Sequence, residues 1–159
     1  MKTTLFTLSL LTATLAAPAT FAGHEVNASA GLTAKGGALA MRGFDPVELV
    51  ERRAVRRGLA TQATTHRGVT YRFATAENLA MFERAPERYS PRFGGYCAYG
   101  VSVGKKFDGD PNLFRVVGGR LYFVLNEEIA AAFDKDPAGA IAKAERNWKK
   151  IRSTKPSDL

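Results

Sequence analysis

The sequence predicts a small single domain of the α+β class, with two antiparallel β-hairpins and several short helices. The first hairpin is indicated by residues 60–66 and 69–74, which alternate around Arg67-Gly68. The second is indicated by LFRVV and RLYFVL, which flank Gly118-Gly119, a favoured pair for a two-residue turn. Helix-start residues precede the apolar segments between and after these hairpins. No internal repeat is present, so one α+β domain accounts for the pattern.

The first residues have the pattern of a cleaved secretory signal. Lys2 precedes an apolar run, Leu5 to Ala17, and Thr20-Phe21-Ala22 forms a small-x-small cleavage site. The run is shorter than the roughly 20 apolar residues of a membrane span. We therefore predict a signal peptide over 1–22 and a secreted or periplasmic product that is not an integral membrane protein.

The remaining chain divides into three parts. Residues 23–40 are rich in glycine and alanine, which predicts a flexible leader with room for a short strand at its end. The folded domain is expected over 41–150, and 151–159 form a polar tail.

The first half of the domain has two helix-start signals. Asp45 followed by Pro46 indicates an N-cap and a first helical turn. Thr75 follows the first hairpin and is expected to cap a helix that carries Leu79 and Phe82 and stops near Pro86. PERYSP then predicts a turn or a single helical turn.

The second half ends in two predicted helices. Asn126 caps the first, and two glutamates in its first turn favour the positive end of the helix dipole. Asp136-Pro137 begins the second helix. Its apolar residues fall on one face: Ile141, Ala144 and Trp148.

The charge balance favours anionic partners. Without residues 1–22 the chain has 22 basic and 15 acidic side chains, and the formal charge falls from +8 to +7 because only Lys2 is lost. Such an excess suits membrane headgroups or cell-wall polymers. Nucleic acid is not expected as a partner of an exported protein. Four arginines after Asp45 form either a solvated face or the contact with an anionic partner: Arg52, Arg53, Arg56 and Arg57.

Cys97 is the single cysteine, so it cannot form an intrachain disulfide. It is a buried apolar residue, a reactive thiol, a metal ligand or half of an intermolecular bridge. If Gly95 to Val103 is helical, then Phe93, Cys97 and Val101 share one stripe, which favours a core position.

A reactive thiol is the alternative for Cys97. Gly94-Gly95 at a helix start would leave N–H groups uncovered, and these, with Lys105 and Lys106, would lower the pKa of the thiol. The phenols of Tyr96 and Tyr99 are expected to support a thiolate by hydrogen bonding.

Several segments resemble the exported YHS-domain proteins. They are GFDPV, GVTYRFATAENLAMFERAPERYSPRFGGYCAYGVSVGK, GDP and VVGGRLYFVLN followed by NW, and together they cover about Gly43 to Trp148. Some members of that group have selenocysteine at the position of Cys97, which implies a reactive or metal-binding role. The YHS modules of copper-transporting ATPases have cysteines at the positions of Ala74 and Asn78, so their two-thiol site is not implied here.

The remaining candidate ligands are few. His66 lies beside the predicted turn and, with Cys97 and either Met41 or a carboxylate, would suit a soft ion such as Cu(I). His24 would follow the cleavage site and could form a separate copper(II) site. Asp45 is treated as a cap with a supporting role. The acidic residues lack the spacing of a calcium loop: Asp108, Asp110 and Asp134.

Three functions follow from these observations. The first is an exported module that binds copper or a similar soft ion through Cys97, with His66. The second is a thiol redox protein in which Cys97 is the catalytic nucleophile and an external thiol partner resolves the oxidised form. The third is a non-catalytic binding module for an anionic partner. No Ser-His-Asp order, phosphate-binding loop or paired-cysteine motif is present, so enzymatic activity is left open.

Overall fold

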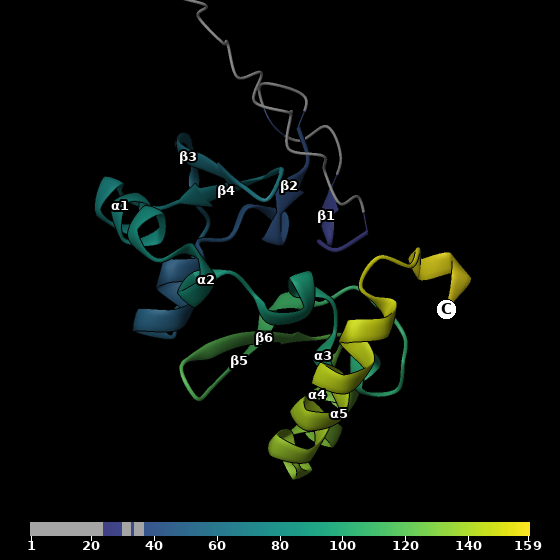
Figure 1. Cartoon of the computed structure of the whole chain (residues 1–159). Helices are drawn as coiled ribbons and strands as arrows, with labels where there is room; N and C mark the ends of the chain where they lie inside the picture. Colours follow the sequence, from purple (N-terminus) through teal and green to yellow (C-terminus); the bar gives the residue numbers. More distant parts are fainter. Residues whose placement is uncertain (1–23, 30–32, 34–36) are drawn as a thin grey trace, which may run out of the picture.

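The computed structural model describes residues 24–29, 33 and 37–159 (Figure 1), and the predicted signal peptide lies outside them. The strands are β1 (Ala28–Ser29), β2 (Leu39–Ala40), β3 (Leu59–His66), β4 (Val69–Phe73), β5 (Asp110–Val117) and β6 (Arg120–Val124). The α-helices are α1 (Ala76–Arg84), α2 (Pro86–Tyr89), α3 (Ala98–Ser102), α4 (Glu127–Lys135) and α5 (Pro137–Ile151). Short 3₁₀ or π turns cover Met41–Gly43, Glu48–Arg52, Arg92–Gly95 and Pro156–Asp158.

The strands form two sheets, and the α+β prediction is confirmed. One sheet has the order β1-β2-β4-β3, in which only β2 and β4 are parallel, and the other is the β5–β6 hairpin. Both predicted hairpins are present. Their two-residue turns, Arg67-Gly68 and Gly118-Gly119, have positive φ at both positions. This matches the type I′ turn, whose twist fits that of the strands it joins.

β6 separates two hydrophobic cores. Successive side chains of a strand point to opposite faces, and those of β6 alternate between the cores. Leu121 and Phe123 belong to the first core, with the β3–β4 hairpin and α1, whereas Tyr122 and Val124 belong to the second, with α3, α4 and α5. In Figure 1 the β5–β6 hairpin accordingly lies between the α1–β4 part and the α4–α5 part of the molecule.

Asp45 connects the first core to the helical turn that follows it. Its side chain is fully buried, and one carboxylate oxygen accepts hydrogen bonds from the N–H groups of Val47 at 2.8 Å and Glu48 at 3.3 Å. The other oxygen accepts from the N–H of Ala74 and the amide of Asn78, both at 2.7 Å. The predicted cap is confirmed, and it also binds the end of β4 and the start of α1.

The other predicted caps are also present. Thr75 accepts from the N–H of Asn78, Asn126 from that of Ile129, and Asp136 from that of Gly139. PERYSP contains the single helical turn α2. These ends form as predicted because each depends on one short side chain near the backbone it caps.

The segment before Cys97 does not form the helix from Gly95 that was one alternative for it. Phe93, Gly94 and Gly95 all have positive φ, at 54°, 62° and 85°, and form a tight turn instead. The helix α3 begins only at Ala98, because consecutive left-handed residues do not continue a right-handed helix. We call 93–95 the left-handed turn.

The N-terminal segment 24–29 crosses the left-handed turn. The N–H of Asn27 donates to the carbonyl of Gly94 at 2.9 Å, and a Cβ on Gly94 would overlap the carbonyl oxygen of Glu25. β2 confirms a short strand at the end of the predicted leader, and β1 is an additional strand that pairs with it. The described parts of the predicted leader therefore contact the folded domain through backbone hydrogen bonds and strand pairing.

Lys106 connects segments from both ends of the described chain. Its buried ammonium donates to the carbonyls of His24, Arg152 and Thr154 at 2.7, 2.5 and 2.8 Å. It also lies 5.2 Å from the ring centres of Tyr96 and Trp148. Burial lowers the pKa of Lys106, and the nearby carboxylate of Glu25 partly offsets this. Among the described helices, none is both long and apolar enough to cross a membrane.

The Asp45 contacts predict a strong dependence of stability on this carboxylate. We expect Asp45→Ala to lower the free energy of unfolding by about 3 kcal/mol, because several buried donors lose their acceptor. Urea denaturation measures this change. Asp158→Ala, at an exposed carboxylate near the end of the chain, is the control and should change stability by less than about 0.5 kcal/mol. Equal effects of the two substitutions would contradict the role of Asp45.

The left-handed turn predicts that alanine costs more stability at Gly94 than at Gly104, although both glycines have positive φ. Gly94→Ala adds backbone strain and a clash with Glu25, whereas Gly104→Ala, at φ 80°, has no atom within 4 Å of the new Cβ. We expect the second change to cost about 1 kcal/mol and the first at least about 2 kcal/mol more. Thermal or urea unfolding compares them, and equal losses would show that 24–29 does not pack on the turn.

Candidate functional site

Cys97 lies at the N-cap of α3 inside the second core. Its side chain is 1% exposed, and its sulfur accepts a hydrogen bond from the N–H of Gly100 at 3.4 Å. Its own N–H donates to the carbonyl of Phe107 at 2.9 Å, and it forms a parallel bridge with Phe123 of β6. Cys97 lines none of the clefts described below.

The predicted acidic thiol is not found. Burial raises the pKa of Cys97, while backbone N–H groups of Gly100, Leu125 and Tyr99 lower it by a smaller amount. The prediction of a lowered pKa is wrong. It included the effect of the N–H groups at the helix start but omitted the desolvation of the buried sulfur, which disfavours the thiolate. The core position, the first of the alternatives for this residue, is the one observed.

The lysines and phenols expected to assist Cys97 make other contacts. Lys106 is held by three carbonyl groups, and Lys105 donates to the carbonyl of Leu159. The ring of Tyr96 packs against Trp148, and burial is the main reason its pKa is raised. Tyr99 is half-buried, and its carbonyl accepts from the hydroxyl of Ser102 at 2.6 Å.

His66 lies at the end of β3, beside the first core. Its Nε2 is 3.1 Å from Oε1 of Glu87, and its ring packs edge-on against Phe82 at 5.9 Å. Cys97 belongs to the second core, so the structure does not combine the two predicted ligands. Within the described residues, no group of three or more His, Cys, Asp or Glu side chains is arranged to hold a metal ion.

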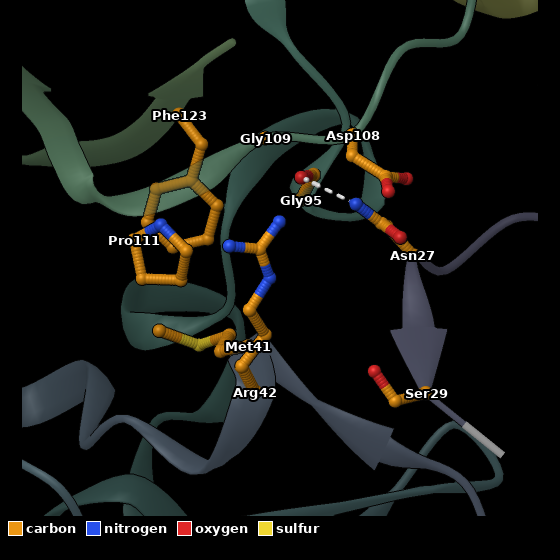
Figure 2. Close-up of a pocket in the computed structure, with 9 residues that line it drawn as sticks. All are labelled: Asn27, Ser29, Met41, Arg42, Gly95, Asp108, Gly109, Pro111 and Phe123. Carbon is orange, nitrogen blue, oxygen red and sulfur yellow. Dashed lines mark hydrogen bonds between the residues drawn. The ribbon is translucent and has the colours of Figure 1, made fainter. Parts of the chain in front are cut away.

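Met41 lines a small polar cavity of about 40 Å³ between the two sheets (Figure 2). The guanidinium of Arg42 points into it, and the side-chain amide of Asn27 also lines it. Asp108 lies at its edge. One water needs about 10–15 Å³ of such space, so this cavity holds only a few waters and no organic substrate.

The acidic residues do not converge. Asp110 accepts from the N–H of Asn112 at 2.9 Å, and its ion pair with Arg42 is 3.8 Å long. Asp134 lies on α4 and pairs with Arg115 at 2.7 Å, and this hydrogen-bonded partner lowers its pKa.

A larger cleft lies between the two cores, with a volume of about 170 Å³. Its charged lining residues are three arginines and two glutamates, and its aromatic ones are Tyr71, Phe93 and Trp148. The charged residues are Glu25, Arg67, Glu87, Arg92 and Arg152. We call it the arginine cleft. Sequence reasoning missed it because its arginines are far apart along the chain and share no motif.

The arginines predicted as a basic face lie in residues 52–59, from the end of the Glu48–Arg52 turn to the first residue of β3, and we call this segment the arginine loop. All four side chains are exposed, and so are two apolar ones, Val55 at 44% and Leu59 at 54%. Arg52 and Arg56 share the buried carboxylate of Glu48, at 3.1 and 3.7 Å. Arg57 lies over the ring of Phe44 at 4.7 Å. These contacts hold the guanidinium groups at the surface.

Comparisons with protein-family models, with curated proteins and with solved structures return no match for this chain.

The burial of Cys97 predicts a protected thiol. In the folded protein at neutral pH, iodoacetamide is expected to modify Cys97 at least about 100-fold more slowly than in urea, because access is blocked and the thiolate is disfavoured. Raising the pH should accelerate the folded-state reaction beyond the pH at which an ordinary thiol is already ionised. Mass spectrometry of quenched samples measures both rates.

A comparable labelling rate in the folded and unfolded protein would contradict this burial. That result would restore the reactive thiol as a candidate site.

Proposed function

We propose that the protein is a non-catalytic binding module that attaches peripherally to anionic lipid surfaces through the arginine loop. The observation that carries the proposal is the exposure of Val55 and Leu59 among four exposed arginines. Basic side chains with apolar neighbours are the composition with which proteins bind the interface of an anionic membrane.

The electrostatic part of the membrane affinity comes from the guanidinium groups of the arginine loop. A basic residue near an anionic membrane contributes about 1 kcal/mol. Arg52 and Arg56 face the carboxylate of Glu48, which reduces their contribution to membrane binding, whereas Arg53 donates to the carbonyl of Val50, a neutral acceptor. The formal charge of +7 expected for the chain without 1–22 would draw it toward such a surface.

The apolar side chains of the arginine loop favour a lipid partner over a polar polymer. Val55 and Leu59 expose surface that a carbohydrate or phosphate polymer would leave in water, whereas the acyl boundary of a membrane removes it from water. Full burial of such a side chain contributes roughly 1.5–3 kcal/mol. Two partly exposed side chains therefore add a contribution smaller than that of the charges.

Soft-metal binding and thiol redox chemistry at Cys97 stay predictions. Both are supported by the single thiol of a chain predicted to be exported and by the resemblance to YHS-domain proteins, and both require the sulfur to leave its buried position. Anaerobic titration with Cu(I) of the protein and of Cys97→Ser tests the first, and equal weak binding by both would exclude it. The arginine loop requires no such opening.

Vesicle binding tests the arginine loop. Replacing Arg53, Arg56 and Arg57 with Gln, while Arg52 is kept as the partner of Glu48, should weaken binding to vesicles of phosphatidylglycerol and phosphatidylcholine about 100-fold. The matched control replaces three exposed lysines of α5 with Gln: Lys143, Lys149 and Lys150. It removes the same charge and should weaken binding less than tenfold. Co-sedimentation measures the partition.

A second variant separates charge from insertion. Val55→Ser with Leu59→Ser should weaken binding about tenfold at unchanged charge. The proposal is contradicted if the arginine and lysine variants lose binding equally, if neutral vesicles bind as well as anionic ones, or if the serine variant binds like the parent.

A further inference from the structure

We propose that the arginine cleft is a binding site for a small planar carboxylate with an aromatic body about the size of benzoate. This site is separate from the arginine loop and does not depend on lipid binding.

The cleft combines residues from distant parts of the chain. Arg67 comes from the β3–β4 turn, Tyr71 from β4, and Glu87 and Ser90 from α2 and the residue after it. Arg92 and Phe93 come from the turn that follows, and Trp148 and Arg152 from α5 and its end. Glu25 and Val26 of the N-terminal segment complete the lining. Concave sites between packed units are where proteins most often bind small molecules.

The volume sets the size of the ligand. A cavity of about 150 Å³ in another protein holds one benzene molecule, and this cleft measures about 170 Å³. A single six-membered ring with a small substituent therefore fits, whereas a nucleotide or a lipid does not. The small cavity beside Met41 has too little room for the same ligand.

The ion pairs of the cleft leave one arginine weakly paired. Three arginines and two glutamates line the cleft, and Arg92 pairs with a third carboxylate, that of Glu145, so each arginine has a carboxylate partner. Arg67 pairs with Glu87 at 2.8 Å and Arg152 with Glu25 at 3.7 Å, beyond hydrogen-bonding distance. A guanidinium has five N–H donors in a planar fork that suits a carboxylate. Arg152 has this long ion pair and an exposed side chain. It is therefore the arginine best able to bind a further carboxylate.

The aromatic residues provide the surface for a ring. Phe93 and Trp148 have ring centres 5.9 Å apart and lie at 62° to each other, and Arg92 lies over Phe93 at 5.9 Å. Aromatic pairs of this kind accept a further ring in an offset or edge-on arrangement. An aliphatic anion would use less of this surface, so the aromatic carboxylate is favoured.

Two features indicate a preformed site. Phe93 has φ 54°, an unfavourable conformation for a residue other than glycine, and such strain is found preferentially where side chains are held for binding. Ser90 also lines the cleft, and its Oγ is buried. Burial raises the pKa of Tyr71 and the nearby Ser90 hydroxyl partly offsets this, but no hydrogen bond of regular geometry from the described part of the chain satisfies Ser90 Oγ.

Trp148 allows a direct test, since it is the single tryptophan of the chain and lines the cleft. Benzoate is titrated against the full chain while tryptophan fluorescence and the indole N–H resonance are followed. We expect saturable changes with benzoate and none with benzamide, its neutral isostere. Cyclohexanecarboxylate should bind more weakly than benzoate, because its ring is not planar.

Variants then assign the anion contact. Arg152→Gln is expected to weaken benzoate binding at least tenfold, as the loss of one charged hydrogen-bonded contact does. The matched control is Arg146→Gln, an exposed arginine also on α5 that does not line the cleft, and it should leave the affinity unchanged. Circular dichroism and urea unfolding verify that both variants fold.

Three results would overturn the proposal. They are equal responses to benzoate and benzamide, equal losses in the two arginine variants, and no change in either tryptophan signal up to the solubility limit of benzoate.

Discussion

The left-handed turn at Phe93–Gly95 is the constraint on which the arrangement of the molecule depends. It turns the chain between the two cores within three residues, and it can do so because two of the three are glycines. The carbonyl of Gly94 holds the N-terminal segment, and Gly95 packs beside the ring of Phe123 on β6. The turn thus positions Phe93 in the arginine cleft on one side and directs Cys97 into the second core on the other.

β6 extends this constraint through the fold. Because its side chains alternate between the two cores, a change that shifts the strand by one residue would exchange the packing of both. The same alternation explains why Cys97 is buried, since its backbone bridges to Phe123 at the wall that β6 forms between the cores. No residue of β6 lines the cleft or belongs to the arginine loop, and there side chains remain available for binding.

The local features of the fold could be predicted because each depends on residues near in sequence. The hairpin turns and the caps at Asp45, Thr75, Asn126 and Asp136 follow from backbone chemistry within a few positions. The helix α3 begins three residues after Gly95, where the helical alternative for this segment would start. The sequence pattern of Gly94-Gly95 does not reveal that both adopt positive φ.

The candidate sites were harder to predict than the fold. The arginine loop was visible as a cluster in the sequence, but the exposure of Val55 and Leu59 depends on tertiary packing. The burial of Cys97 and the meeting of Arg67, Arg92 and Arg152 also result from long-range contacts. A charge pattern along the chain identifies neighbours in sequence, whereas a cleft is formed by neighbours in space.

The contacts of Lys106 link the local opening of the segment before β1 to that of the segment after α5. One ammonium group donates to carbonyls from the segment before β1 and from the segment after α5, more than 40 residues away in either direction. If one segment detaches, this buried charge loses an acceptor and its hold on the other becomes less favourable. The two segments are therefore thermodynamically coupled, and local opening releases them as one cooperative unit instead of two independently fraying ends.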